Sequence, residues 1–441
     1  MIRLAPGGEG APRGAADAPP LVVSVAMGYG HLRAAHAVAR ALGAEVLHAD
    51  APPLASDEEA RLWKHTRLAY EATSRLSQLP WVGGPLRSAL EALTDIPRLH
   101  PLRDLSGRTA AVRAVERLLH RGVGRGLVDA LHASGAPLVT TFYVPAIAAD
   151  RAGCRRVHCV VTDADVNRVW ATAEPAKGRI RYLAPSRRVA RRLVAYGVPP
   201  ERITFTGFPL PDELVGGASL ETLSRNLAAR LVRLDPEREF RRAYRDELAR
   251  FLGPLPGELQ GSPPLVVFAV GGAGAQAELA RVFLPRLRSA VLGGRMRLAL
   301  VAGTRREVAD GFRRELDRAR FGAAAANAVE VLEASTFAEY YDRFNALLAR
   351  ADVLWTKPSE LTFYAALGLP LVFAWPVGTH ERYNRRFAVE AGAGLRQGDP
   401  RYAADWLAEW LADGTLAGAA WSGFMRLPKH GLYRIVEAVT G

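Results

Sequence analysis

Three segments decide the fold: DVLWTKPSEL at residues 352–361, ALGLPLV at residues 366–372 and GTHERYN at residues 378–384. The first contains an apolar run long enough for a buried strand, which is followed by Pro358. The second holds the end of a short helix at Gly368 and the start of another apolar strand. Strand, polar loop, helix and strand in this order form a βαβ unit. Open α/β sheets bind their ligands at the loops that follow such strands.

Polar side chains crowd the two loops that this βαβ unit brings to one edge of the sheet. We predict loops at residues 356–360 and 377–384, which carry Thr356, Lys357, Ser359, Glu360, His380, Glu381 and Asn384. Lysine and hydroxyl groups donate to phosphate oxygens, and carboxylates accept from sugar hydroxyls. The sequence therefore predicts a polar pocket suited to a nucleotide-sugar.

The length and composition favour two α/β domains, and we expect no bound metal or cofactor. The chain has 441 residues, which is long for one domain. No run approaches the roughly 20 apolar residues of a membrane span, and the Gly-, Ala- and Pro-rich first 19 residues show no secretory signal. The two cysteines, Cys154 and Cys159, predict neither a disulfide framework nor a zinc site. We therefore expect a cytoplasmic protein.

The charge of the chain favours anionic partners. The formal net charge is +13, and only four of the 58 basic residues are lysines. Such a charge favours phosphate-bearing ligands or acidic lipids. The basic residues are spread over the predicted helices without a nucleic-acid-binding module, so we expect no nucleic-acid partner.

A helical, arginine-rich region at residues 56–132 mixes aromatic and basic side chains, among them Trp63, Arg67 and Trp81. Such a surface suits contact with an anionic membrane. Ordinary amphipathic helices around a core would show the same pattern. The sequence leaves both interpretations open.

The loop after the first strand is a second candidate site. Residues 21–26 predict a buried parallel strand, which the sequence MGYGHLR at residues 27–33 follows. Gly28 and Gly30 allow a close approach of the backbone, and His31 falls at the start of a helix, where free N–H groups favour an anion or a neutral imidazole. The loop is not a dinucleotide fingerprint, because arginine stands where the third glycine would be. We predict His31 as a catalytic or acceptor-site residue, with a capping histidine as the alternative.

Two further strand ends in the first half carry candidate residues. Residues 137–141 predict a strand that Tyr143 closely follows, and residues 157–162 predict a strand that ends at Asp163. Asp163 therefore occupies a functional position of this architecture. An aspartate that only caps the next turn would occupy the same place.

The second half opens with a glycine loop. Residues 265–270 predict a strand, and Gly271, Gly272 and Gly274 follow it before a helix. Such a loop exposes backbone N–H groups to a phosphate. The next predicted strand, residues 298–302, is followed by Thr304 and Arg305.

These alternating strands and helices predict the following division of the chain: a disordered segment at residues 1–19, a Rossmann-like domain at residues 20–215 with a helical insertion at 56–132, a helical segment and linker at 216–262, a second Rossmann-like domain at 263–425, and a terminal helix at 426–441.

The order of these motifs resembles the GT-B glycosyltransferases, in particular the branch that holds monogalactosyldiacylglycerol synthases, processive diacylglycerol glucosyltransferases and peptidoglycan N-acetylglucosaminyltransferases. The resemblance covers about residues 21–440. It rests on Gly28-Tyr29-Gly30-His31, Val161-Thr162-Asp163, Pro185-Ser186, Ile203 with Gly207-Phe208-Pro209, Gly271 to Gly274, Thr356-Lys357, Gly368-Leu369-Pro370, Glu381 to Asn384, Gly392-Ala393-Gly394 and Leu427-Pro428.

The resemblance implies transfer of a sugar from a nucleotide-diphosphate sugar, such as a UDP-sugar, to an acceptor hydroxyl, with inversion and without a metal bound by the protein. His31 would be the catalytic base, with Asp163 as the second candidate. Acceptor contacts would come from Gly28, Tyr29, Gly30 and Tyr143. Donor contacts would come from Gly271, Gly272, Gly274, Thr304, Arg305, Thr356, Lys357, Ser359, Glu360, His380, Glu381 and Asn384. The domain at residues 20–215 would bind the acceptor, the domain at 263–425 would bind the donor, and the terminal helix would return to the first domain. Because the family mostly glycosylates lipids, the acceptor would be a lipid such as diacylglycerol, reached from the inner face of the membrane. A soluble small molecule stays open as the alternative acceptor.

Three features depart from the family pattern. The family's glycine-rich turn after Thr-Lys is shortened here to Pro358-Ser359, and His380 stands where the family commonly has glutamine. Phe363 stands where the family has the glutamate that binds the donor ribose, and Glu360, one helical turn away, is the candidate replacement. Two other functions stay open. One is a nucleotide-sugar 2-epimerase-like enzyme on the same fold, and the other is a non-catalytic nucleotide-sugar-binding protein.

Overall fold

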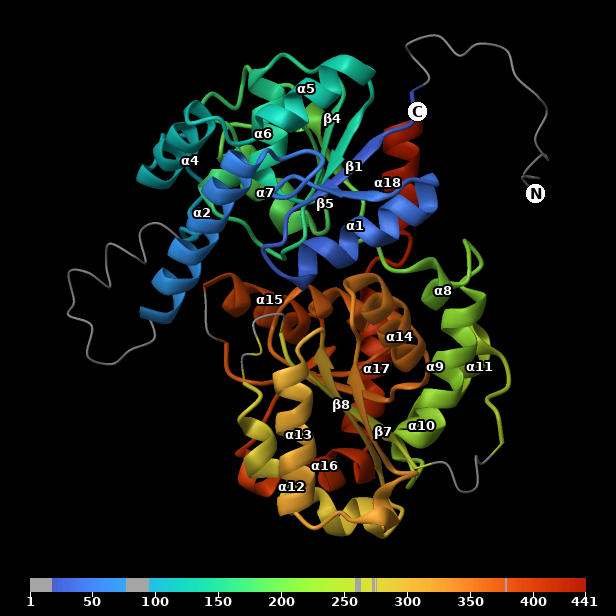
Figure 1. Cartoon of the computed structure of the whole chain (residues 1–441). Helices are drawn as coiled ribbons and strands as arrows, with labels where there is room; N and C mark the ends of the chain where they lie inside the picture. The colour runs from blue at the N-terminus through green and yellow to red at the C-terminus, as the bar shows by residue number, and fades with distance from the viewer. Residues whose placement is uncertain (1–17, 77–94, 258–262, 272–273, 275, 377–378) are drawn as a thin grey trace, which may run out of the picture.

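The chain forms two α/β domains stacked one above the other in a computed structural model (Figure 1). The structure describes residues 18–76, 95–257, 263–271, 274, 276–376 and 379–441. Almost all of the predicted N-terminal disordered segment therefore lies outside the described residues.

The upper domain in Figure 1 holds a parallel sheet with the strand order β2-β1-β3-β4-β5-β6. Its strands are β1 (Leu21–Ser24), β2 (Val46–His48), β3 (Leu138–Thr140), β4 (Val157–Val160), β5 (Arg181–Ala184) and β6 (Ile203–Phe205). Side chains alternate between the two faces of a strand. Accordingly, Val22 packs with Ala35 and Val38 on one face, and Val23 packs with Leu127 and Ile147 on the other.

Helices cover both faces of this sheet. They are α1 (Tyr29–Leu42), α2 (Asp57–Leu76), α4 (Ala110–His120), α5 (Arg125–Ser134), α6 (Tyr143–Arg151) and α7 (Arg187–Ala195), with 3-10 turns η1 (Arg168–Trp170) and η2 (Pro200–Arg202). The Ser186 hydroxyl caps α7 by accepting from the Val189 N–H at 3.1 Å.

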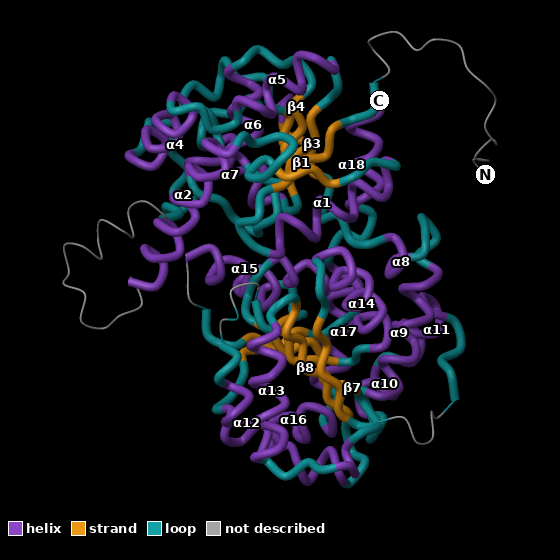
Figure 2. The backbone as a smooth tube through the Cα atoms, in the orientation of Figure 1, coloured by secondary structure: helices purple, strands orange, loops and turns teal. Residues whose placement is uncertain are grey.

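The lower domain holds a second parallel sheet, with the order β12-β11-β10-β7-β8-β9. Read from the other edge, this is the 3-2-1-4-5-6 order of doubly wound dinucleotide-binding sheets. Its strands are β7 (Leu265–Ala269), β8 (Arg297–Gly303), β9 (Val329–Glu333), β10 (Val353–Thr356), β11 (Leu371–Phe373) and β12 (Gly394–Arg396). The covering elements are α12 (Leu279–Leu292), α13 (Arg306–Arg318), η3 (Ala323–Ala325), α14 (Phe337–Arg350), η4 (Glu360–Leu367), α15 (Thr379–Glu390), η5 (Pro400–Tyr402), α16 (Ala403–Ala412) and α17 (Thr415–Arg426). Figure 2 shows both sheets enclosed by helices. The predicted fold class, two Rossmann-like domains in a GT-B arrangement, is confirmed.

Two connections join the domains. The segment between the sheets forms α8 (Asp212–Val215), α9 (Glu221–Arg233), α10 (Glu239–Ala243) and α11 (Arg245–Leu252). The last helix, α18 (Gly431–Thr440), lies in the upper domain, where Leu432 and Ile435 pack with Ala35 and Val38 of α1 (Figure 1).

The structure corrects two local predictions. The loop predicted at residues 377–384 is helical from Thr379 onward, because α15 begins there. The helix predicted after Pro358 is a 3-10 helix, η4, and every residue of it is buried. Sequence patterns distinguish these cases poorly, since a polar helix face and a polar loop share the same residues. No described helix is long and apolar enough to cross a membrane.

Candidate active site between the two domains

Each sheet places one candidate loop at its topological switch point, where the strand order reverses. In the upper sheet this point lies between β1 and β3. His31 lies in the first turn of α1, which follows β1, and Thr141 directly follows β3. In the lower sheet it lies between β7 and β10, whose following loops carry Gly271 and Lys357. Ligands of doubly wound sheets bind at such points.

Thr141 fixes both the backbone and the ring of His31. The Thr141 hydroxyl donates to the His31 carbonyl at 3.0 Å, and the His31 Nδ1 lies 2.8 Å from the Thr141 carbonyl oxygen. A carbonyl oxygen only accepts, so Nδ1 of the neutral ring carries the proton and Nε2 keeps its lone pair. The arrangement gives His31 the tautomer that a general base needs.

The environment of His31 keeps its ring neutral. Burial lowers the pKa of His31, against the opposing fields of Asp163 and Glu360. His380 also acts on this pKa, in the lowering direction. Since Glu360 and His380 belong to the lower domain, His31 lies within electrostatic reach of both domains.

Aromatic rings surround the base candidate on the acceptor side. The His31 ring meets Phe142 edge-on, with centroids 4.9 Å apart, and lies 6.3 Å from Trp170. Tyr143 packs between these residues, 4.4 Å from Phe142 and 5.5 Å from Trp170. The predicted acceptor residue Tyr143 therefore shares one aromatic cluster with His31.

Asp163, the second base candidate, is held from the other domain. Asn384 on α15 donates from Nδ2 to Asp163 Oδ1 at 3.0 Å, and its Oδ1 accepts from the Ala164 N–H at 2.8 Å. The buried Asn384 amide thus fixes the loop after β4. The structure brings this predicted donor-binding residue to the upper domain.

The glycine loop, Lys357 and α15 meet on the lower side of the interface. A Cβ added to Gly271 would lie 2.4 Å from Cε of Lys357, so a side chain at this position would displace the lysine. Lys357 Nζ pairs with Glu381 Oε1 at 2.6 Å. The Gly274 N–H donates to the Gly271 carbonyl at 2.7 Å. Gly272 lies outside the described residues.

Two predicted hydroxyl groups bond to the backbone of their own domain. The Thr356 hydroxyl donates to the Ala269 carbonyl at 2.9 Å, which ties β10 to β7. The Ser359 hydroxyl accepts from the Leu361 N–H at 3.4 Å and caps η4. Both order the loop that carries Lys357.

Glu360 forms a buried ion pair across the interface. Its Oε1 accepts from Nε of Arg33 at 2.9 Å, and the side chains of Arg33 and Glu360 are 2% and 9% exposed. A Cβ on Gly30 would lie within 3.0 Å of Glu360 Oε2, so the glycine lets the loop approach this carboxylate. Phe363, the residue at the family's glutamate position, is buried and stacks on Phe208 with centroids 4.8 Å apart.

Tyr29 makes a second cross-domain contact. Its hydroxyl accepts from the Thr304 N–H at 3.0 Å and lies 2.8 Å from the Thr304 hydroxyl. Its ring packs against Tyr340 with centroids 4.9 Å apart. Arg305, the neighbour of Thr304, pairs with Glu307 at 3.2 Å. Gly28, at the N-cap of α1, completes the predicted acceptor loop.

Sequence reasoning missed Arg33 and Tyr340, which complete the buried contact with Glu360. Arg33 donates to the Tyr340 hydroxyl as well as to Glu360. No local pattern identifies Arg33, because a charged residue on a helix is normally exposed. Trp63, proposed as a membrane anchor, is 4% exposed and belongs to the upper core, so that role is wrong. Trp81 lies outside the described residues, and only the backbone is described at Arg67.

The described residues contain no group of three or more His, Cys, Asp or Glu side chains that could hold a metal ion. On the lower side of the interface, Lys357 is the cationic group beside Gly271.

Residues 258–434 match the sequence family DUF6938, which is described as a domain of unknown function. No curated protein matches the chain. Among solved structures, the chain is similar to the S. aureus MnaA-UDP co-structure, with a TM-score of 0.50, 12% sequence identity and coverage of 95% of both chains. It is also similar to MurG of Acinetobacter baumannii, with a TM-score of 0.49, 14% identity and coverage of 96% of this chain and 99% of that chain. A UDP-GlcNAc 2-epimerase from Methanocaldococcus jannaschii, in complex with UDP-GlcNAc and UDP, gives a TM-score of 0.45, 12% identity and coverage of 95% and 98%. At these identities the similarity concerns the fold.

Proposed function

We propose that this chain is a glycosyltransferase that moves a sugar from a UDP-sugar to an acceptor hydroxyl between its two domains. The observation that carries the proposal is the geometry of His31. Its Nδ1 is engaged by the Thr141 carbonyl, its Nε2 keeps a lone pair, and burial lowers its pKa. A general base needs this protonation state at neutral pH.

In this proposal the lower domain stabilises the leaving diphosphate. Lys357 supplies a cation beside Gly271, and the N-terminus of α15 supplies backbone N–H groups. The Lys357–Glu381 pair would then have to exchange, in part, for a contact between Lys357 and phosphate. The UDP in the S. aureus MnaA co-structure supports the choice of donor.

In the upper domain, His31 would take the proton of the acceptor hydroxyl, and Asp163 would stabilise the imidazolium that forms. The field of Asp163 at His31 supports this role. The family resemblance adds inversion, a lipid acceptor such as diacylglycerol and a peripheral position on the inner face of a membrane. These finer points are predictions of the resemblance.

Mass spectrometry of the full chain with a panel of UDP-sugars and hydroxyl-bearing acceptors tests the proposal. Sugar transfer supports it. Formation of an epimer without an acceptor would identify a 2-epimerase-like enzyme, and binding without turnover would identify a nucleotide-sugar-binding protein.

Two variants assign the roles. His31→Ala should lower turnover by roughly 10²–10⁴-fold and leave UDP binding intact. The matched control is His132→Ala, at an exposed histidine on α5 of the same domain. Lys357→Ala should weaken UDP binding by about 1.5–3 kcal/mol in titration calorimetry. Lys177→Ala is its control, because this lysine is 82% exposed and belongs to the other domain.

A further inference from the structure

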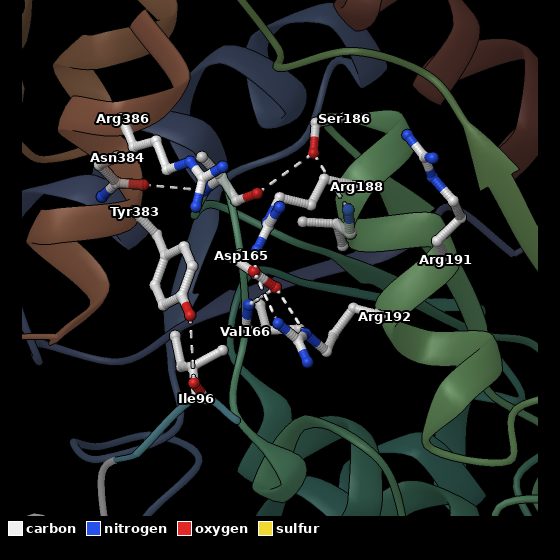
Figure 3. Close-up of polar contacts among 12 residues, drawn as sticks. Ile96, Asp165, Val166, Ser186, Arg188, Arg191, Arg192, Tyr383, Asn384 and Arg386 are labelled. Carbon is white, nitrogen blue, oxygen red and sulfur yellow. Dashed lines mark hydrogen bonds and ion pairs between the residues drawn. The ribbon is translucent and has the colours of Figure 1, made fainter. Parts of the chain in front are cut away.

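An arginine-rich rim lies where α7 of the upper domain faces α15 of the lower domain (Figure 3). Tyr383, Asn384 and Arg386 on α15 face Asp165, Arg188 and Arg192 in this view. The two helices also carry Arg187, Arg191, Arg382 and Arg385. Among the residues that the structure describes, Asp165 binds Arg188 and Arg192, and Glu390 binds Arg386.

Asp165 is a fully buried anchor for this rim. Arg192 donates to it twice, from Nε at 2.8 Å and from Nη2 at 2.9 Å. The Val166 N–H adds a third bond at 3.0 Å. Because Asp165 and Arg192 are both buried with 0% exposure of their side chains, the carboxylate is rigidly placed.

Arg188 is held on this anchor with its outer end free to bind a ligand. Its Nε donates to Asp165 Oδ2 at 2.6 Å, and its guanidinium lies 5.0 Å from the centroid of the Tyr383 ring. Tyr383 is in turn fixed by a 3.2 Å bond to the Ile96 carbonyl. The Arg188 side chain is 25% exposed, and neither terminal amino group bonds to a residue that the structure describes.

We propose that Arg188 and Arg386 bind a phosphate group carried by the acceptor. A guanidinium presents its N–H groups as a planar fork that matches two phosphate oxygens. Holding that fork in place before binding removes an entropic cost that a mobile arginine would meet. Arg386, whose side chain is 59% exposed, adds a second cation from the opposite domain.

The rim adjoins the proposed transfer site through one short loop. The Asp163 charge raises the pKa of His31, the Ala164 N–H donates to the Asn384 side chain, and the Asp165 carboxylate accepts from Arg188. A phosphate on Arg188 would therefore bring a neighbouring hydroxyl of the same molecule toward His31. This inference rests on the proposed function in one respect, because it identifies the ligand as the acceptor. It favours an acceptor that carries a phosphate over diacylglycerol, which has none.

Titration calorimetry of the full chain with sn-glycerol 3-phosphate, and with glycerol as the uncharged probe, tests the site for a free phosphate ester. Flotation with phosphatidylcholine vesicles, with and without phosphatidic acid, tests it for a lipid headgroup.

The variants are Arg188→Gln and Arg386→Gln. The second changes only a surface side chain and so avoids a folding defect. Arg318→Gln is the control, because it removes the same charge from a 65% exposed side chain in the lower domain.

We expect Arg188→Gln to weaken binding of the phosphate probe roughly tenfold or more, Arg386→Gln to weaken it less, and Arg318→Gln to leave it unchanged. A loss in the calorimetric arm identifies a soluble phosphate ester, and a loss confined to vesicles identifies a headgroup. Binding that neither rim variant changes, or that Arg318→Gln weakens equally, overturns the site. Neither arm needs turnover. Failure of sugar transfer with the rim binding intact would refute only the proposed function, and the reverse would refute only this inference.

Discussion

Two arginines on α1 bind acidic residues of the lower part of the molecule, and their surroundings differ. Arg33 pairs with Glu360 at 2.9 Å, and both side chains are almost fully buried. Arg40, two helical turns further on, pairs with Asp342 and lies 3.6 Å from Glu213, and its side chain is 48% exposed. The same helix face therefore carries one dry and one solvated ion pair.

The difference between the pairs lies in what surrounds the charge. The Arg33 guanidinium lies 4.8 Å from the Tyr340 ring centroid and 4.4 Å from that of Phe344. Burial alone would lower the pKa of Arg33, but Tyr340 and Glu360 raise it above the ordinary value. A buried charge depends on its partner, whereas water can replace the partner of an exposed one. We therefore expect removal of one partner of the Arg33–Glu360 pair to cost more stability than removal of one partner of the Arg40 pair.

Removing Glu360 should have the largest effect on stability. Glu360→Ala leaves Arg33 buried without its carboxylate, and we expect the free energy of unfolding to fall by about 3–5 kcal/mol in urea titrations. The double variant Arg33→Met with Glu360→Leu should recover most of this loss, because no unpaired charge remains. A loss below about 1 kcal/mol in the single variant would contradict the comparison.

Acid should weaken the same interface through His36, which lies on α1 between the two arginines and packs against Phe337 and Tyr341. Burial, with the field of Arg40, lowers the pKa of His36 to about 4. The unfolded chain then binds a proton more readily than the folded one, so stability falls as the pH drops from 6.5 toward 4. Because the ring is half-buried and solvent screens its charge, we expect a loss of about 1–2 kcal/mol. Unfolding curves of His36→Gln between pH 7 and about pH 4 should show a smaller decline. An equal decline would assign the acid sensitivity to other groups.

Tyr29→Phe should have an intermediate effect. The variant keeps the ring against Tyr340 but removes the hydroxyl that accepts from the Thr304 N–H. Loss of this partly buried contact should cost about 0.5–1.5 kcal/mol in the free energy of unfolding. Tyr402→Phe, at a tyrosine that is 57% exposed, provides the control. If both variants match the wild type, Tyr29 does not help to hold the domains together.

Arg40→Ala should have the smallest effect. Exposed ion pairs contribute about 0.2–1 kcal/mol, and salt screens them. The loss should therefore be visible in low-salt urea titrations and disappear near 1 M NaCl. A loss that persists at high salt would show that the methylene groups of Arg40, which lies over the Tyr341 ring, matter more than its charge.

The sequence by itself determined the two doubly wound sheets and the loops that face each other. Apolar runs such as Leu21 to Ser24 and Leu265 to Ala269 form strands wherever they can be buried on both faces, and the glycines after them allow tight loops. These are local properties, and they also located His31, Gly271 and Lys357 at strand ends. The role of Ser186 as the N-cap of α7 could likewise be predicted, because a helix N-cap depends on its immediate neighbours in the sequence.

Only the tertiary structure decided which of these residues meet. Arg33 and Glu360 are separated by 327 positions, Tyr29 and Thr304 by 275, and Asn384 and Asp163 by 221. The pattern within a helix or strand shows which face is buried, and it carries no information about the partner across an interface. The partners are set by how the two domains pack. This packing brings Arg33 to Glu360 and brings Asn384 to the loop that carries Asp163. Burial then makes such contacts selective, because a charge removed from water is stable only beside its own partner.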